Sequence, residues 1–200
     1  EVSRSPGISR RELSRLLNST DSKLSRITRD LIADSLLVEK ATTRSAMRGR
    51  PNVGLYLNPP GLHVLCIVLS RYEQKISIVD LARQRVAEDD IEGGVEDCNE
   101  HILDCARRLI TRLSERPEMR FERLAGISVI VSPDIEFGGQ QNQQAWLDTL
   151  QNDLSANFNV PVAHSGIAEA LHIAGRHSNS RFIVSWVPLK WRTNWPGWNI

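Results

Sequence analysis

Basic side chains are concentrated in the first 58 residues of this chain. That stretch holds 11 Lys and Arg against 6 Asp and Glu, whereas the rest of the 200 residues holds 14 against 18. The net charge of +1 is therefore the average of a basic front and a mildly acidic remainder. Because Lys and Arg bind the phosphates of nucleic acids, this asymmetry predicts a nucleic-acid-binding module joined to a domain of another kind.

The segment Arg48-Gly49-Arg50-Pro51 has residue types that suit the minor groove of DNA. Glycine lets the backbone approach a groove floor, proline keeps the segment extended, and the two arginines are attracted to the negative potential of a narrow A·T-rich groove. The alternative is a plain basic loop that ends in a rigid turn. Beside a DNA-binding fold, we favour the minor-groove interpretation.

Two helices are expected to position the remaining basic residues. In residues 9–17 the leucines follow helical spacing, and Ser9 with Glu12 fits a capping box. Asn18 tolerates the left-handed conformation of a tight turn, and Thr20 can cap a second helix over residues 21–33. The second helix is expected to bury its apolar residues, which are Leu24, Ile27, Leu31 and Ile32.

The outward positions of the second helix are polar or basic: Ser22, Lys23, Ser25, Arg26 and Arg29. Two short helices joined by such a turn indicate a helix-turn-helix. An ordinary helical hairpin with solvated arginines would give the same spacing. The expected strands 36–40 and 53–57, with Arg44, Arg48 and Arg50 between them, favour a winged helix.

Beyond the stiff linker Pro59-Pro60-Gly61 the pattern changes to alternating strands and helices. The order predicts an α/β domain with a mixed sheet. Its expected strands are 62–69, 75–81, 84–87, 124–131, 160–163 and 181–187, and its expected helices are 96–113, 145–157 and 166–175. Residues 186–200 hold four of the five tryptophans and show no period. They are either a functional aromatic tail or an abnormal ending, and together with a first residue other than Met they suggest a fragment.

The remaining composition argues against several classes of protein. The longest apolar run, 64–69, is too short to span a bilayer, and the first residues hold no secretory signal. The three cysteines (Cys66, Cys98 and Cys105) fit neither a disulfide framework nor a zinc site. We expect a cytoplasmic protein with no metal, cofactor or membrane partner.

Several segments resemble the ROK family (repressors, open reading frames and kinases), in particular its bacterial sugar-responsive repressors. They are SRRELSRLLNSTDSKLSRITRDLIADSLLVEK, RGRPNVGLYLNPPGLHVLCIVL, ISIVDLARQRV, RLAGISVIVSPDIEFGG and NVPVAHSGIAEALHIAGR, in the order of the family. The resemblance implies a winged helix-turn-helix in residues 1–58. Residues 62–185 would form part of the first lobe of an actin-like, sugar-kinase-like (ribonuclease H-like) domain, followed by the atypical tail 186–200.

The resemblance also implies roles for the basic module. Thr20 stands where the family has the serine that opens the recognition helix. Asn18 and Ser35 replace two glycines of the family. We expect base-edge contacts from the front of the second helix, phosphate contacts from its flank and from the first helix, and minor-groove contacts from the RGRP segment. The residues are, in that order, Ser22, Lys23, Ser25 and Arg26; Arg29, Arg10 and Arg11; and Arg48, Gly49 and Arg50.

The kinase signatures of the family do not carry over. Leu69-Ser70-Arg71-Tyr72 stands where family kinases have an Asp-x-Gly-Gly-Thr phosphate loop. After Pro161-Val162 no carboxylate occurs until Glu169, so the Asn-Asp pair with the catalytic base is missing. His164 could substitute, although a lone histidine near a strand end is more often structural. We therefore expect no catalytic residues.

These observations predict a DNA-binding transcriptional regulator, a repressor of carbohydrate-metabolism genes with a degenerate effector lobe. Its partners would be a double-stranded operator, a second copy of the chain, and a sugar or sugar phosphate. Ser132-Pro133-Asp134 and Gly138-Gly139 resemble the loop that borders the family's sugar cleft, but such residues also mark ordinary turns. The alternatives are a ROK-type sugar kinase and a non-functional remnant of a repressor gene.

Overall fold

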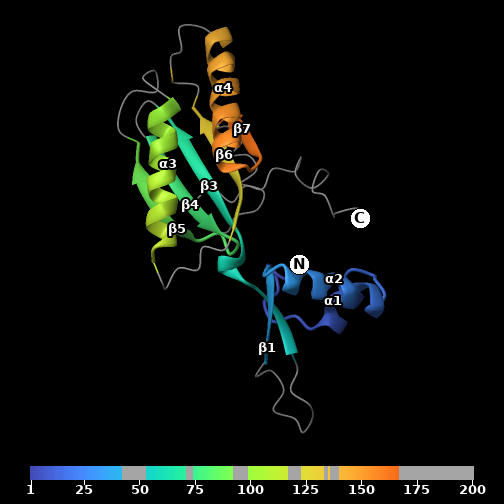
Figure 1. Ribbon diagram of the computed structural model, residues 1–200. Helices are drawn as coiled ribbons and strands as arrows, with labels where there is room; N and C mark the ends of the chain where they lie inside the picture. The colour runs from blue at the N-terminus through green and yellow to red at the C-terminus, as the bar shows by residue number, and fades with distance from the viewer. Residues whose placement is uncertain are drawn as a thin grey trace.

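The computed structural model describes residues 1–41, 53–70, 74–91, 99–116, 123–132, 135 and 140–166. Two groups of elements are separated in Figure 1: α1, α2 and the β1–β2 pair lie at one end, and a larger sheet with α3 and α4 lies at the other. Each group has its own cluster of buried apolar side chains. None of the described helices is long and apolar enough to cross a membrane.

The first group begins with two helices, α1 (Arg10–Leu16) and α2 (Asp21–Ala33). The predicted capping box is present: the Glu12 amide donates to Ser9 Oγ at 3.2 Å, and the Ser9 amide donates to Glu12 Oε2 at 2.9 Å. Thr20 caps α2, and Asn18 has a φ of +48° in the connection. This left-handed residue reverses the chain between the helices without a glycine, as the sequence predicted.

A β-hairpin follows α2. Strands β1 (Leu37–Ala41) and β2 (Val53–Leu57) pair antiparallel with Leu37 opposite Leu57 and Ala41 opposite Val53. Ser35, just before β1, has a φ of +59°, so this position does require the conformation that glycine adopts more easily. The order of helix, turn, helix and hairpin is the one predicted from the sequence.

A small core holds this group together. It consists of Leu13, Leu24 and Leu55, with the half-buried Val2, Ile8 and Ile32 packed against them. Ile8 also forms an isolated bridge to Leu55, so the residues before α1 close one side of the core. The expectation that Ile27 faces inward is wrong. Ile27 is 38% exposed, and Thr28, at i+4 from Leu24, is buried in its place with its hydroxyl bonded to Leu24 O.

The short 3₁₀ helix η1 (Pro59–Gly61) joins the two groups. The Asn58 amide donates to Leu36 O at 3.0 Å, and Asn58 Nδ2 donates to Ser35 O at 2.7 Å. On the other side, the Leu81 amide donates to Pro59 O at 3.1 Å. The predicted linker is therefore bonded both to the end of the helical group and to the sheet.

The larger sheet has the order β5-β4-β3-β6-β7. Its strands are β3 (His63–Leu69), β4 (Gln74–Asp80), β5 (Arg85–Asp90), β6 (Leu124–Val131) and β7 (Val162–Gly166). β3, β4 and β5 pair antiparallel, whereas β3, β6 and β7 pair parallel. The predicted α/β domain with a mixed sheet is confirmed.

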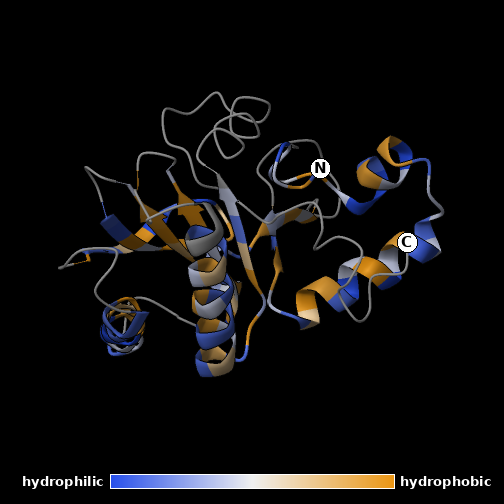
Figure 2. Cartoon of the chain, turned by 90° about the horizontal axis from the view of Figure 1, so that it is seen from above, coloured by the Kyte–Doolittle hydropathy of each residue, from blue (hydrophilic) through white to orange (hydrophobic). Residues whose placement is uncertain are grey.

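Helices α3 (Asn99–Ser114) and α4 (Gln140–Phe158) cover one face of this sheet. Both lie on the same side of the strands in Figures 1 and 2, as expected when successive β-α-β crossovers advance in one direction across a sheet. In Figure 2 the central strands carry mainly hydrophobic colours. The core between the layers includes Leu65, Ile76, Leu109, Ile127 and Leu150, all at most 1% exposed.

Several element boundaries differ from the expected ones, among them those of β5, α4 and β7. Strand β5 continues to Asp90 because its acidic residues pair with β4, with Lys75 opposite Asp90. Helix α4 begins at Gln140, in a glutamine-rich turn without apolar periodicity. Strand β7 begins two residues later than expected, since Ile127 of β6 pairs with Val162. Gly166, expected to begin a helix, is instead the last residue of β7. The rest of that expected helix (167–175), the strand 181–187 and the tail 186–200 lie outside the described residues.

Candidate nucleic-acid interface

Helix α2 presents one polar and basic side to solvent. Ser22, Lys23, Arg26 and Arg29 are exposed, as is the capping residue Thr20, and Ser25 is half-buried. The opposite side is fixed by Leu24 and Thr28, which are at most 3% exposed. The structure therefore brings the predicted base-reading residues together on the free side of one helix.

The cations of the two helices are available for an external anion. Among the described residues, no carboxylate lies within salt-bridge distance of five of these cations: Arg11 and Arg15 in α1, and Lys23, Arg26 and Arg29 in α2. On the sheet and its helices, Arg85, Arg107 and Arg112 each have a carboxylate partner, whereas Arg83 and Arg108 have none among the described residues. Unpaired exposed guanidinium groups are what phosphate binding requires.

Arg10 differs from the other predicted phosphate contacts. Its Nη2 lies 2.9 Å from Glu39 Oε1, so its guanidinium ties the start of α1 to β1. The sequence could not show this pair, because the two residues are 29 positions apart and meet only through the fold. In this arrangement Arg10 supports the module, and a DNA phosphate would have to compete with Glu39 for it.

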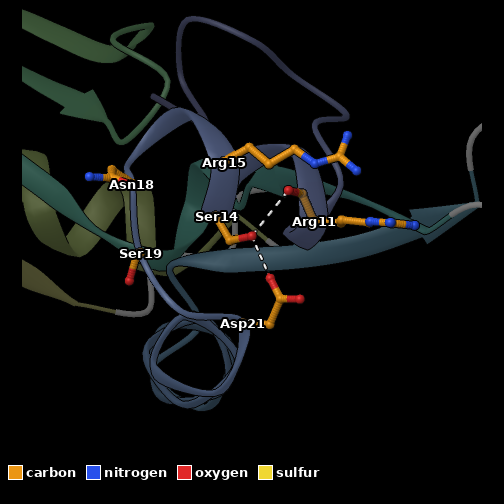
Figure 3. Close-up of a pocket in the computed structure, with 6 residues that line it drawn as sticks. All are labelled: Arg11, Ser14, Arg15, Asn18, Ser19 and Asp21. Carbon is orange, nitrogen blue, oxygen red and sulfur yellow. Dashed lines mark hydrogen bonds between the residues drawn. The ribbon is translucent and has the colours of Figure 1, made fainter.

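An open hollow of about 460 Å³ lies at the corner between α1 and α2. It is lined by the six residues drawn in Figure 3: Arg11, Ser14, Arg15, Asn18, Ser19 and Asp21. The arginine side chains leave α1 on the same side, while Ser14 and Asp21 point toward each other. Ser14 Oγ lies 2.5 Å from Asp21 Oδ1 and 3.1 Å from Arg11 O.

Sequence reasoning missed Arg15 and Ser14 as part of this surface. The signal for Arg15 was present, since residues at i and i+4 lie on the same side of a helix and Arg11 was already predicted to bind phosphate. Ser14 gave no local signal, because a serine within a short polar helix is expected to be solvated.

The hairpin contributes a further cation, Lys40, near the end at which residues 42–52 connect its two strands. Lys40 Nζ lies 5.7 Å from the centroid of the Tyr56 ring, in a cation–π contact across the two strands. Ala41 and Val53, which are paired, flank the segment that carries Arg44, Arg48, Gly49 and Arg50. That segment lies outside the described residues, so its minor-groove role stays a prediction.

The other chemical candidates offer no catalytic arrangement in the part of the chain that the structure describes. Burial raises the pKa of the Cys66 thiol to about 12, and burial together with Asp89 raises that of Cys105. His164 is exposed on β7, opposite Val129. No group of three or more His, Cys, Asp or Glu side chains that could hold a metal occurs among these described residues. Arg71 and Tyr72, Pro133 and Asp134, Gly138 and Gly139, and Glu169 lie outside them.

Comparisons with known proteins point to transcriptional regulators. No family model matches the chain. The DNA-binding transcriptional repressor Mlc of Escherichia coli (strain K12) is 30% identical over 125 residues, which are 61% of this chain and 30% of the repressor. A solved structure described as a ROK family transcriptional regulator, homolog of the E. coli Mlc protein, matches with a TM-score of 0.63 and 20% identity.

The structural match covers 86% of this chain and 45% of the solved one, so the chain spans less than half the length of the relatives it matches. At this identity the structural match shows a shared fold, and the sequence match to Mlc adds similarity at the level of residues. Together they confirm the resemblance that the motifs predicted: this chain is similar in sequence and in fold to transcriptional regulators of the ROK family.

Proposed function

We propose that this chain is a sequence-specific DNA-binding transcriptional regulator of the ROK type, acting as a repressor. Residues 1–58 would be its winged helix-turn-helix. The observation that carries the proposal is the set of five cations on α1 and α2 that have no carboxylate partner among the described residues, beside the polar free side of α2. The match to Mlc, which is a DNA-binding repressor by its description, supports the same function.

In this proposal α2 lies in the major groove. Ser22, Lys23, Ser25 and Arg26 then meet base edges, where a good contact from Lys or Arg to guanine contributes about 1–3 kcal/mol of discrimination. Arg29 and Arg11 bind phosphates, which sets affinity and its dependence on salt. Arg10 supports α1 through Glu39 and adds to phosphate binding only where this pair opens.

The hairpin segment completes the DNA contacts. Arg48 and Arg50 would enter the minor groove beside the helix, with Gly49 allowing close approach. Because such arginines respond to groove width, this contact would favour operators with A·T-rich flanks. Operators of this class are usually palindromic, so we propose that the regulator binds as a homodimer.

We propose that the second part of the chain, residues 62–185, belongs to the first lobe of an actin-like, sugar-kinase-like domain and is not an enzyme. The mixed sheet with two helices on one face supports the lobe. A sugar or sugar phosphate would be the effector, carbohydrate-metabolism genes the targets, and the cytoplasm the place of action.

Selection of duplexes from a library with a randomised centre, followed by gel shifts, tests the proposed function. The chain is expected to enrich one sequence, and Lys23→Ala is expected to relax base preference more than it lowers affinity for random DNA. Arg50→Ala is expected to weaken binding mainly at A·T-flanked sites. Arg112→Ala is the matched control, since Arg112 is already paired with Asp89 at 3.0 Å. A chain that enriches no sequence contradicts the proposal.

A further inference from the structure

Ser14 is a buried polar residue in α1, a short helix whose other polar side chains are mostly exposed to solvent. It is 4% exposed, next to the core residue Leu13, whereas the rest of α1 is largely exposed. A buried hydroxyl lowers stability unless it is hydrogen-bonded, so its bonds explain its presence. Its single proton has two acceptors in reach, the carbonyl of Arg11 within its own helix and the carboxylate of Asp21.

The bond to Asp21 joins the two helices of the corner. Asp21 is the first residue of α2, directly after the capping residue Thr20. The backbone of Ser14 makes a second bond to the same connection, since the Ser19 amide donates to Ser14 O at 2.9 Å. One residue of α1 therefore holds both the turn and the first turn of α2, the end at which the proposed base-reading side chains begin.

The same bond fixes the direction of the Asp21 side chain. Asp21 is exposed and directly precedes Ser22 and Lys23, so without this bond its carboxylate would rotate freely in solvent. In Figure 3 the carboxylate is turned toward α1 and Ser14. A hydrogen bond to a charged acceptor is stronger than one between neutral groups, so this orientation is well held.

We infer that Ser14 is a positioning residue for DNA reading: its hydroxyl holds the Asp21 carboxylate against α1, which fixes the start of α2. This inference rests on the proposed function. It predicts that the two residues act as a unit, so that loss of either removes the same contribution.

The test measures the ratio of the dissociation constants for a random duplex and for a duplex selected by the wild-type chain. Ser14→Ala is expected to lower this ratio about tenfold, which corresponds to about one base contact. Ser14→Thr keeps the hydroxyl and should stay within about twofold of wild type, on the same scale. Asp21→Ala should lower the ratio as Ser14→Ala does, and the double variant should lose no more than either single one.

Asp30→Ala is the matched control, because Asp30 is an exposed carboxylate of the same helix for which no side-chain partner is found among the described residues. It should tighten both duplexes alike and leave the ratio unchanged. Urea denaturation of each variant checks folding, and if Ser14→Ala is unfolded the Ser14→Thr and Asp21→Ala chains carry the test. A Ser14→Ala chain that keeps the ratio, or single effects that add in the double variant, overturns the inference alone. A wild-type chain that selects no sequence overturns the proposed function together with the DNA-reading role of Ser14.

Discussion

Gly61→Ala tests how the helical group is joined to the sheet. A Cβ at residue 61 would lie 1.8 Å from Ser35 O, 2.8 Å from Ser35 C and 3.1 Å from Asn58 Nδ2. The two nearest atoms are backbone, and Ser35 O would have to move by more than an ångström to reach an ordinary contact. They are also held: Ser35 O accepts from Asn58 Nδ2 at 2.7 Å, and the Ser35 amide donates to Ile32 O at 3.0 Å.

The cost of this substitution follows from two terms. Forcing a methyl group into a packed site costs about 1–3 kcal/mol. Loss of the hydrogen bond from Asn58 adds about 1 kcal/mol. We therefore expect the free energy of unfolding to fall by about 2–4 kcal/mol, which lowers the urea midpoint by about 1–2 M for a denaturant slope of about 2 kcal/mol/M.

Pro59→Ala is the control for Gly61→Ala in the same 3₁₀ turn. Pro59 is exposed, and its carbonyl, which accepts from Leu81, is retained. We expect this change to cost only about 0.4–1 kcal/mol, through the entropy of the unfolded chain. A Gly61→Ala chain with the urea midpoint of the wild type would refute the packing described at this junction.

Two further predictions concern the start of α1 and a buried thiol. Ser9→Ala is expected to lower the free energy of unfolding by about 1 kcal/mol in urea denaturation, because the Glu12 amide loses its capping acceptor. Ser3 is exposed, so Ser3→Ala should have little effect. Equal effects of the two changes would contradict the capping role. Burial raises the pKa of the Cys66 thiol from 9.0 to about 12, so between these values the folded chain keeps a proton that the unfolded chain loses. The contribution of Cys66 to the free energy of unfolding should therefore be fully present below pH 9 and fall as the pH rises toward 12. Cys66→Ala should make the free energy of unfolding depend less on pH in this range. Parallel curves of unfolding free energy against pH for the wild type and the variant would show that another group causes the dependence.

Local signals predicted most of the fold. Helix α2 begins and ends where its cap and leucine spacing placed it, and the long buried strand β6 has the predicted bounds. Elements without apolar periodicity were harder to bound. The start of α4 is rich in glutamine, and the end of β5 is acidic, so only pairing and packing within the fold define them.

The candidate site also has residues that local sequence signals predict and residues whose roles only the fold defines. The exposed cations of α2 follow from helical spacing, because the buried side of a helix fixes its free side. The roles of Arg10 and Ser14 depend on partners elsewhere in the chain, Glu39 and Asp21, which no local pattern identifies. The apolar pattern of the helix predicts Ile27 in the core, yet the helix turns Thr28 inward, where its hydroxyl donates to the helix backbone.

The salt dependence of DNA binding tests the central claim most directly. Arg11 and Arg29, the two helix residues proposed to neutralise phosphates, should together contribute about −1.8 to the slope of the logarithm of the association constant against the logarithm of salt concentration. Arg29→Ala should make this slope less steep by about 0.9, whereas Arg112→Ala should leave it unchanged. A binding constant that does not depend on salt, or an equal effect of both substitutions, would contradict the claim that these helices bind DNA.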